Sequence, residues 1–307
     1  MGCLCSRESI FVNNTKYYVI DRLGEGGFST VDLVENVNNR RRYALKRITC
    51  HSIEDQRTAL EEVEYCKKIK HPNVIELVDS TFKGTADIVM NATSELYMVL
   101  PYFRNGTLHD YLIKKALNNE HIEVRDVLRI FTDVCEAVKC FHDMKPEPLA
   151  HRDIKTANVC LTESLSPVLM DLGSTAPARV QVCGSQEAQR LQDTAAERCS
   201  MPYRAPELFN VESYCVIDQR TDIWSLGCLL YAMCYFKSPF DAVYERGDSV
   251  ALAVISGNIH FPDDSPYDQD MHNLILYMLK VNPMERPYIY SVIEKTQDYI
   301  SKIENKV

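Results

Sequence analysis

The stretch that decides the fold is His-Arg-Asp-Ile-Lys-Thr-Ala-Asn at residues 151–158, which is followed after a short apolar hairpin by Asp-Leu-Gly at residues 171–173. Phosphoryl transfer needs little covalent help from a protein. It needs metal ions that bridge the phosphates, a carboxylate that aligns the attacking hydroxyl, and a cation near the transferred group. Two carboxylates, one amide and one ammonium at this spacing suit that chemistry. The alternative for the first stretch alone is a solvated surface turn.

Each of these requirements has a candidate side chain in the two stretches. Asp153 would accept or orient the attacking hydroxyl, and Lys155 would stabilise the phosphoryl charge. Asn158 and Asp171 would bind Mg²⁺ through hard oxygen ligands. The sequence therefore predicts a phosphoryl-transfer site that uses magnesium.

A glycine-rich turn is predicted near the amino terminus, between two strands. The apolar run at residues 17–20 leads into Leu-Gly-Glu-Gly-Gly-Phe-Ser-Thr-Val at residues 23–31, and residues 31–34 alternate as a half-buried strand does. Glycines allow backbone amides to approach phosphates closely, and Phe28 at the tip would shield them from water. An ordinary tight hairpin is the alternative.

A buried ion pair is predicted beside this turn. Lys46 lies on a predicted strand at residues 43–48, on the opposite face from Leu45, and its ammonium could reach nucleotide phosphates. Glu62 lies on the inward stripe of a predicted helix at residues 54–69. Because an unpaired carboxylate is costly to bury, we expect Lys46 to be its partner.

Two further segments are predicted to build the site, one near the nucleotide base and one before the catalytic stretch. After a predicted strand from Val74 to Phe82, a second strand at residues 95–100 ends at Pro101, which lacks an amide hydrogen, so free backbone groups near Tyr102 would suit an adenine edge. Apolar residues between Val124 and Phe141 form one helical stripe, which predicts a long core helix that delivers the catalytic stretch.

Composition excludes several classes of protein. The chain has 307 residues, enough for two lobes, and 46% of them are hydrophobic, which is ample for a core. Its formal charge of -9 argues against nucleic-acid binding, and the short basic run at residues 40–42 is interpreted as a solvated turn. Twelve cysteines without a secretory leader or a Cys-x-x-Cys pair indicate a reducing compartment and argue against zinc. No apolar run is long enough to span a bilayer.

The amino terminus nonetheless predicts a membrane anchor. Met-Gly-Cys-Leu-Cys-Ser at residues 1–6 fits the pattern in which Gly2 is myristoylated, and Cys3 and Cys5 lie beside it as candidates for palmitoylation. One myristoyl chain binds a membrane only marginally, whereas two acyl chains hold a protein there stably. The alternative is an unmodified tail.

Many spaced motifs together resemble the protein kinases. In order they are Gly24-x-Gly26-x-x-Ser29-x-Val31, Ala44-x-Lys46, Glu62, His151-Arg152-Asp153-x-Lys155-x-x-Asn158, Asp171-Leu172-Gly173, Ala205-Pro206-Glu207, Asp222-x-Trp224-Ser225-x-Gly227 and Arg286. More narrowly, residues 24–29 and the predicted acylated start resemble the Numb-associated kinase family. Two positions depart from the general pattern: Leu172 replaces phenylalanine and Ser29 replaces glycine. Neither change removes a catalytic group.

The resemblance implies a two-lobed α+β fold, with a small antiparallel β N-lobe carrying one main helix and a mainly helical C-lobe. The expected parts are an acylated tail at 1–15, an N-lobe at 16–100, a hinge at 101–104 and a C-lobe at 105–303. It also implies Mg·ATP as cofactor, with ATP bound by Leu23, Gly24, Gly26, Gly27, Phe28, Ser29, Val31, Ala44, Lys46, Leu100 and Tyr102. The catalytic groups would be Asp153, Lys155, Lys46 and Glu62.

The activation segment at residues 171–207 is the most individual part of the chain. Residues 185–198 are mostly helix formers, Ser185 is a candidate N-cap, and Ala188, Leu191 and Ala195 form a face that could dock the helix. The resembling family has a helix there. A built-in helix would order the segment without phosphorylation, so we expect constitutive activity. We also expect the enzyme to autophosphorylate. A mobile loop of helix-prone composition is the alternative.

The resemblance also implies which hydroxyl groups are phosphorylated, which buried contacts support the site and which partners the protein has. Lys155 and Ser200 are typical of serine/threonine kinases, with minor tyrosine activity not excluded. Glu207 and Arg286 would form a buried ion pair, and Asp222 would bind backbone of the catalytic stretch. The expected partners are protein substrates and, through the acyl groups, the cytosolic face of Golgi or trans-Golgi membranes, with a cytoplasmic pool. We expect a monomer.

Two other functions would use a similar fold. A catalytically silent nucleotide-binding scaffold should lack at least one of the catalytic groups, and none is lost. A small-molecule kinase should lack Ala205-Pro206-Glu207 and its Arg286 partner, and both are present.

Overall fold

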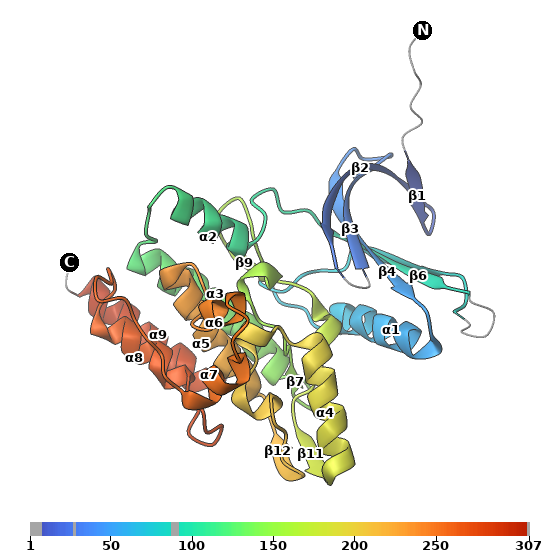
Figure 1. Ribbon diagram of the computed structural model, residues 1–307. Helices are drawn as coiled ribbons and strands as arrows, with labels where there is room; N and C mark the ends of the chain where they lie inside the picture. Colours follow the sequence, from blue (N-terminus) through green and yellow to red (C-terminus); the bar gives the residue numbers. More distant parts are fainter. Residues whose placement is uncertain (1–7, 27–28, 87–91, 306–307) are drawn as a thin grey trace. The chain divides into compact units, whose positions relative to one another are not determined.

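The computed structural model describes residues 8–26, 29–86 and 92–305, which form two compact units. Among these residues, unit 1 contains those up to Lys70 and Ile75–Tyr102, and unit 2 contains His71–Val74 and those from Phe103 onward. Unit 1 is an antiparallel sheet with one long helix, and unit 2 is mainly helical (Figure 1). This confirms the predicted α+β class.

Unit 1 is built on a six-stranded antiparallel sheet in its described part, in the order β1-β2-β3-β4-β6-β5. The strands are β1 Ser9–Val12, β2 Thr15–Glu25, β3 Ser29–Asn36, β4 Arg42–Cys50, β5 Asp79–Lys83 and β6 Ser94–Pro101. Tyr17, Val34, Leu45 and Val99 share the buried face of the sheet. They alternate with residues on the opposite face, as the two-residue period of a strand requires.

Helix α1 (Ile53–Lys68) lies alongside β4 and β6 (Figure 1). It begins where Ser52 forms a capping box with Asp55: the Ser52 side chain accepts from the Asp55 amide, and the Asp55 carboxylate accepts from the Ser52 amide. Its buried side chains include Val63 and Cys66 beside Glu62. The predicted helix at 54–69 is confirmed within one residue at each end.

The predicted tail at 1–15 is wrong over its second half. Residues 9–12 form β1, which pairs with β2, and Ile10 and Val12 are buried. A four-residue strand is too short for its alternation to stand out in the sequence, and its pairing with β2 supplies the stability. Residues 1–7, with Gly2, Cys3 and Cys5, lie outside the described part of the chain.

The strand predicted from Val74 to Phe82 is also wrong in its first part. Only Asp79–Lys83 forms β5, whereas Val74 pairs with Leu169 in unit 2 as an isolated bridge. The Asn73 side chain donates to the Pro167 carbonyl, and the Asn73 carbonyl accepts from the Leu169 amide. These bonds, made to residues distant in sequence, hold residues 71–74 in unit 2.

Unit 2 is organised around helices α3 and α5. Its helices are α2 Leu108–Leu117, α3 Val124–His142, α4 Ser185–Arg198, α5 Arg220–Tyr235, α6 Asp241–Glu245, α7 Val250–Ser256, α8 Gln269–Met278 and α9 Ile289–Glu304. Short strands join them: β7 Leu149–Ala150, β8 Val159–Leu161, β9 Pro167–Leu169, β10 Ala176–Pro177, β11 Val180–Cys183 and β12 Tyr214–Ile217. The apolar stripe predicted on α3 is buried, and Trp224 on α5 is core. No helix in the described ranges is both long and apolar enough to cross a bilayer.

Helix α5 approaches the end of α8 at a glycine. A Cβ atom on Gly227 would lie 2.7 Å from Cδ2 of Leu279 and 3.1 Å from Cβ of Met278. These distances are shorter than carbon atoms tolerate in contact. Gly227 therefore sets how closely the two helices pack.

We predict that Gly227→Ala lowers the free energy of unfolding by about 1–3 kcal/mol, because the added methyl group overpacks the interface between the helices. Urea denaturation measures the change. The same change is then made in a Leu279→Ala background, which lacks the contacting atoms. There, Gly227→Ala should lower the free energy of unfolding by less than it does in the parent chain. Equal costs in both backgrounds would show that the close approach is not the cause.

Candidate functional site

The glycine-rich turn lies in a hairpin, as predicted. Gly24 pairs with Val31 across β2 and β3, and the Gly26 amide donates to the Ser29 carbonyl over 2.7 Å. A Cβ atom on Gly26 would lie 3.5 Å from Oγ of Ser29, so the residue that replaces the third glycine packs against the turn. Gly27 and Phe28 lie outside the described residues.

One face of the sheet carries the other predicted nucleotide-binding residues of unit 1. Val31 pairs with Lys46, and Ala44 pairs with Leu100. Residues directly opposite each other on adjacent strands share a face. Val31, Ala44, Lys46 and Leu100 therefore lie together on the face opposite Leu45. Leu23 is 44% exposed near the end of β2.

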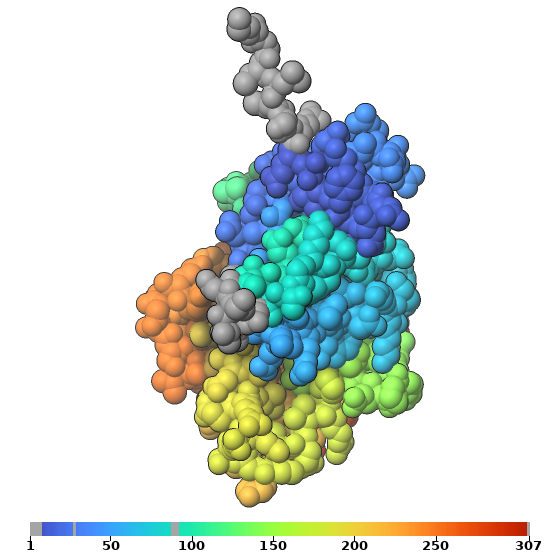
Figure 2. Space-filling model, turned by 90° about the vertical axis from the view of Figure 1, so that its right-hand side faces the viewer, coloured from blue at the N-terminus to red at the C-terminus, as the bar shows by residue number. Residues whose placement is uncertain are grey.

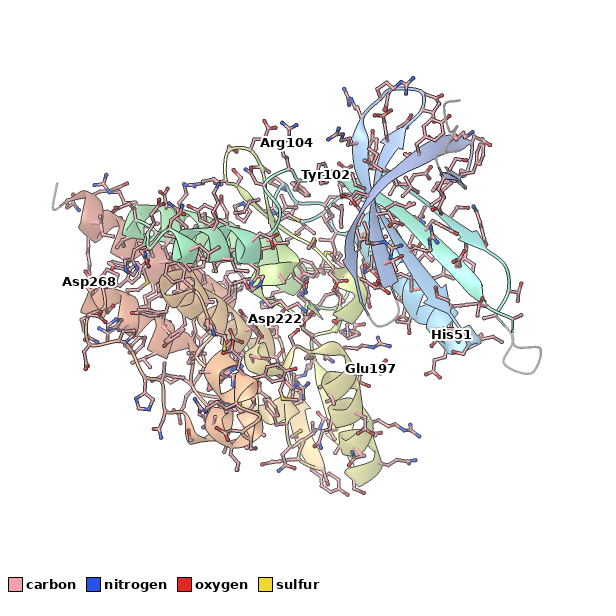
Figure 3. All side chains as sticks on the ribbon, turned by 45° about the horizontal axis from the view of Figure 1, so that its top comes forward. His51, Tyr102, Arg104, Glu197, Asp222 and Asp268 are labelled. Carbon is pink, nitrogen blue, oxygen red and sulfur yellow. The ribbon has the colours of Figure 1, made fainter. Side chains whose placement is uncertain are left out.

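Tyr102, labelled in Figure 3, follows β6 as the last residue of unit 1. The predicted hinge at 101–104 thus includes the boundary between the two units.

Lys46 and Glu62 form the predicted ion pair. Nζ of Lys46 lies 2.7 Å from Oε1 and 3.0 Å from Oε2 of Glu62, and both side chains are largely buried. Charge-assisted bonds to both carboxylate oxygens fix the ammonium in one position. The pair places a positioned cation on the face that carries Val31 and Ala44.

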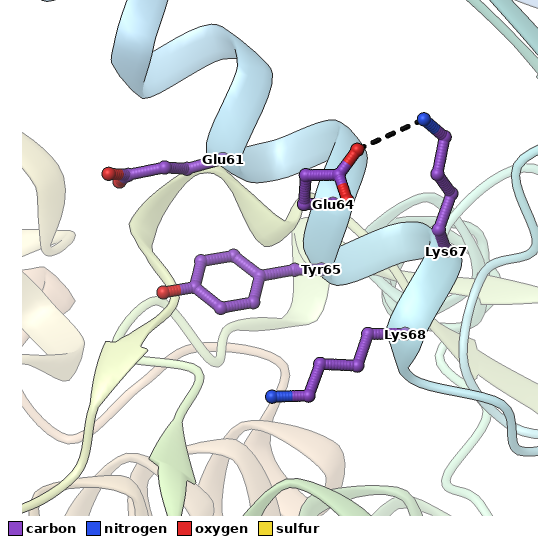
Figure 4. A pocket seen from close by; sticks show the side chains of 5 residues that line it. All are labelled: Glu61, Glu64, Tyr65, Lys67 and Lys68. Carbon is purple, nitrogen blue, oxygen red and sulfur yellow. Dashed lines mark hydrogen bonds and ion pairs between the residues drawn. The ribbon is translucent and has the colours of Figure 1, made fainter.

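An open pocket on the exposed side of α1 is a separate feature (Figure 4). Its lining side chains, Glu61, Glu64, Tyr65, Lys67 and Lys68, come from one helix, and Glu64 pairs with Lys67 at 3.0 Å. The convergent groups that bind a nucleotide come from several elements. We therefore do not assign this pocket to the site.

The catalytic stretch of unit 2 is held by Asp222 at the start of α5 (Figure 3). Its carboxylate accepts hydrogen bonds from the amides of His151 and Arg152, each over 2.8 Å. His142 of α3 contacts the same carboxylate at 3.1 Å. Asp222 thus binds the backbone of the stretch, as predicted, whereas sequence reasoning missed His142.

The environment of Asp222 favours its ionised form. Burial alone would raise the pKa of this fully buried carboxyl group, but the hydrogen bond with His142 and those from the backbone hold the pKa below its usual value. Arg152 adopts a φ of 65°, an uncommon conformation for a residue with a side chain. The two hydrogen bonds to Asp222 stabilise this conformation.

Asp153 lies at the centre of a polar network. Its Oδ2 accepts from Nδ2 of Asn158 at 2.8 Å and lies 2.9 Å from Nζ of Lys155. Its Oδ1 accepts from the amide of Ser200 at 2.9 Å, while Lys155 donates to Oγ of Ser200 at 2.7 Å. The network places a carboxylate and an ammonium side by side, as alignment of a hydroxyl for phosphoryl transfer requires.

The two predicted metal ligands are brought together by the hairpin between β8 and β9. The Asn158 carbonyl accepts from the amide of Met170, the residue before Asp171. Since Nδ2 of Asn158 donates to Asp153 twice, its side-chain oxygen is the atom that a cation would meet. The described residues contain no cluster of three His, Cys, Asp or Glu side chains that would hold a metal ion. One amide oxygen and one carboxylate fit Mg²⁺, which takes its other ligands from phosphates and water.

Leu172, which replaces the usual phenylalanine, is 1% exposed. The replacement therefore retains an apolar core contact directly after Asp171, and it leaves the carboxylate of Asp171 unchanged.

The activation segment contains the predicted helix, α4, alongside β11 and β12 (Figure 1). Its Ala188 and Ala195 are buried, and Ala188 packs with Val182, Val211 and Leu191. The predicted docking face is confirmed. The N-cap is Gly184 rather than Ser185, because the backbone there has a φ of 136°, which glycine adopts without strain.

Sequence reasoning also missed Arg204, whose guanidinium is buried under the end of α4. Its Nη2 donates to the carbonyls of Ala196 and Cys199 over 3.2 and 2.8 Å. A cation at the carboxyl end of a helix donates hydrogen bonds to its last carbonyls and interacts favourably with the negative end of the helix dipole. Nothing in the spacing of Arg204 distinguished it from a surface arginine.

The segment is anchored at its end by the predicted pair of Glu207 and Arg286. Nη1 and Nη2 of Arg286 lie 2.8 and 2.9 Å from the two carboxylate oxygens of Glu207. Arg286 also donates to the carbonyls of Arg220 and Lys280, so its buried charge is well satisfied.

We predict that Asp222→Asn lowers the free energy of unfolding at pH 7 by about 3 kcal/mol, because it removes a charge that two amides and His142 stabilise. The folded pKa is depressed, so this contribution is present above the unfolded pKa near 4 and is lost as the pH falls through the folded pKa. Urea unfolding at several pH values should show the difference between parent and variant shrinking below about pH 4. A difference that stays constant with pH would contradict the assignment.

Comparison with known proteins agrees with this geometry. A family model described as the protein kinase domain matches residues 17–297. Serine/threonine-protein kinase 16 of Rattus norvegicus is 41% identical over 287 residues, which cover 94% of this chain and 91% of that protein, and the protein of that name in Homo sapiens gives the same figures. Serine/threonine-protein kinase ppk13 of Schizosaccharomyces pombe is 30% identical over 95% of this chain and 93% of its own length. This chain therefore belongs to the protein kinase family, as an ATP-dependent serine/threonine protein kinase.

Proposed function

We propose that this chain is a membrane-tethered member of the Numb-associated kinases, active without phosphorylation of its activation segment. It transfers the γ-phosphate of Mg·ATP to serine and threonine hydroxyls of proteins, including its own, with minor action on tyrosine. Acyl groups on Gly2, Cys3 and Cys5 hold the monomeric enzyme on the cytosolic face of Golgi-associated membranes, with a cytoplasmic pool.

In this proposal the catalytic stretch aligns the acceptor hydroxyl. Asp153 accepts the hydrogen bond of the incoming hydroxyl, while Lys155 offsets charge on the transferred group. Lys46, fixed by Glu62, binds the α- and β-phosphates. Asn158 and Asp171 would hold Mg²⁺, which neutralises the phosphates when bound.

The observation that carries constitutive activity is the contact between Ser200 and the catalytic pair. The Ser200 amide and hydroxyl bind Asp153 and Lys155 over 2.9 and 2.7 Å. In kinases that require phosphorylation, a phosphate orders this segment by pairing with arginines. Here unmodified side chains supply the contacts that order it.

Helix α4 supplies the rest of that order. At its start, the Glu187 carboxylate accepts a hydrogen bond from the Cys183 amide at 2.7 Å. Midway, the Gln192 side chain accepts from the Val211 amide at 3.1 Å. At its end, Arg204 donates to the Cys199 carbonyl, and the Ser174 hydroxyl donates to the Arg198 carbonyl at 2.8 Å. The segment thus has partners at its start, middle and end.

We predict that phosphatase-treated enzyme, shown by mass spectrometry to carry no phosphate, phosphorylates a generic protein substrate within about twofold of the untreated rate. Initial rates with Mg·ATP measure this. Activity that is absent until Ser174, Thr175, Thr194 or Ser200 is phosphorylated would refute constitutive activity.

Arg204→Gln should lower the activity of the phosphate-free enzyme by about tenfold or more, because α4 loses the cation under its last turn. The matched control is Arg125→Gln, which removes an exposed arginine from α3 and should leave the rate unchanged. An Arg204→Gln rate equal to that of the control would show that ordering of α4 is not needed for catalysis.

Replacing the proposed catalytic carboxylate should slow turnover strongly without unfolding the protein. Asp153→Asn is expected to lower kcat by about 10²–10⁴-fold, because the hydroxyl loses its proton acceptor. Circular dichroism checks that the variant is folded. Equal phosphate incorporation by parent and variant would contradict the assigned role.

The membrane anchor is tested by Gly2→Ala, which prevents myristoylation. We expect the variant to move from the membrane fraction to the soluble fraction of cells, since palmitate alone would have to hold it. Unchanged partitioning would refute the anchor.

A further inference from the structure

One exposed face of unit 1 combines cations with aromatic rings. It consists of Phe11, Lys16, Tyr18, Arg40 and Arg42, and we call it the basic face. The run at 40–42 was interpreted above as a solvated turn, and all three arginines are indeed exposed. The strand register places Arg42 on this face, and a salt bridge to Glu35 holds Arg40 beside it.

The pairing of strands places these residues on one surface. Phe11 pairs with Lys16 across β1 and β2, and Tyr18, two residues further along, lies on the same face. Tyr18 in turn pairs with Glu35, and Glu35 pairs with Arg42. The intervening buried residues, such as Tyr17 and Val34, point to the opposite side.

The turn between β3 and β4 adjoins the same surface. The Lys16 carbonyl accepts from the Val37 amide, and the Arg41 carbonyl accepts from the Asn36 amide. The turn therefore lies beside the start of β2, and the guanidinium of Arg40 reaches Glu35 on this surface. Strands β1 and β2, dark blue in Figure 2, are at the molecular surface.

The charge of the basic face is opposite to that of the whole chain. Its three cations are Lys16, Arg40 and Arg42, and Arg40 pairs with Glu35 at 3.0 Å. The chain has a formal net charge of -9. A local excess of arginine on an acidic protein indicates a polyanionic partner.

The rings of the basic face add an apolar component. Phe11 is 52% exposed, and Nζ of Lys16 lies 5.7 Å from its ring centre and 5.3 Å from that of Tyr18. Aromatic rings beside lysine and arginine are typical of the boundary between lipid headgroups and acyl chains.

Chain length connects this face to the proposed anchor. Cys5 precedes Ser9, the first residue of β1, by four residues, which span at most about 14 Å when fully extended. An acyl chain on Cys5 therefore brings β1 close to the membrane surface. Attraction of arginine to anionic lipids acts over about one Debye length, roughly 8–10 Å.

We propose that the basic face binds the anionic headgroups of the membrane to which the acyl groups tether the chain. The proposal rests on the proposed acylation and adds a second, electrostatic contact beside the turn between β3 and β4, at the end of the sheet face that carries Ala44 and Lys46 further along β4. A myristoyl chain alone binds with an association constant of about 10⁴ M⁻¹, so such a contact would turn marginal binding into stable residence.

The test uses the full-length chain made together with an N-myristoyltransferase, and also the unmodified chain. Mass spectrometry reports acylation. Binding is measured by sedimentation with phosphatidylcholine vesicles and with vesicles that also contain phosphatidylserine, at low and high salt. The first variant is Arg40→Gln/Arg42→Gln. The matched control is Lys67→Gln/Lys68→Gln, which removes the same charge from the exposed end of α1, where Figure 4 shows both lysines.

At low salt we expect the parent chain to bind phosphatidylserine vesicles at least tenfold more tightly than neutral vesicles, since each arginine near the surface contributes about fivefold. The arginine variant should lose this preference but keep its binding to neutral vesicles and its kinase activity. The lysine control should retain the preference. Phe11→Ser should weaken binding to both vesicle types by about threefold or more.

Equal binding of the arginine variant and the parent would overturn the proposal, as would an equal loss in the lysine control, which would point to overall charge alone. The test distinguishes failure of the acylation proposal from failure of the basic-face proposal. A chain that the transferase leaves unmodified refutes the anchor, whereas the comparison of variants on the unmodified chain still decides the basic face.

Discussion

A single buried carboxylate holds the catalytic stretch of this kinase in place. Asp222 is fully buried at the start of α5 and accepts hydrogen bonds from two consecutive amides, those of His151 and Arg152. An ion in the protein interior is tolerated only when such bonds replace its hydration. The carboxylate therefore ties a loop to the most buried helix of unit 2, and it supports a φ of 65° at Arg152.

The remaining catalytic groups follow from that attachment. Directly after the anchored amides, Asp153 is placed to bind Asn158 and Lys155, and its second oxygen binds the amide of Ser200. Ser200 belongs to the activation segment, so the order of the catalytic stretch extends into that segment. At the far end, Glu207 is fixed by Arg286. Buried charges thus hold the last part of the segment, from Ser200 to Glu207, and α4 packs against β11 before it.

The sequence was most informative where chemistry restricts residue type. The ion pair of Lys46 and Glu62, that of Glu207 and Arg286, and the binding of backbone by Asp222 were predicted and are present in the structure. So was the helix at 185–198, because its composition favours a helix and its apolar residues recur at helical spacing.

Predictions failed where distant partners decide the structure. Residues 9–12 form a strand because β2 supplies its hydrogen bonds, and Val74 joins Leu169 instead of extending β5. The N-cap of α4 is set by a backbone angle that only glycine adopts easily, so Gly184 takes the place predicted for Ser185. Arg204 and His142 act through contacts that no local spacing reveals.

The central claim is that unmodified side chains order the activation segment. Amide hydrogen exchange on phosphate-free enzyme, followed by mass spectrometry, tests it most directly, because exchange reports the opening of each helix. We predict that peptides covering residues 188–195 of α4 exchange at least about 10²-fold more slowly than an unstructured chain, with or without phosphate. Exchange at the unstructured rate in the phosphate-free enzyme, with protection appearing only after phosphorylation, would contradict the account.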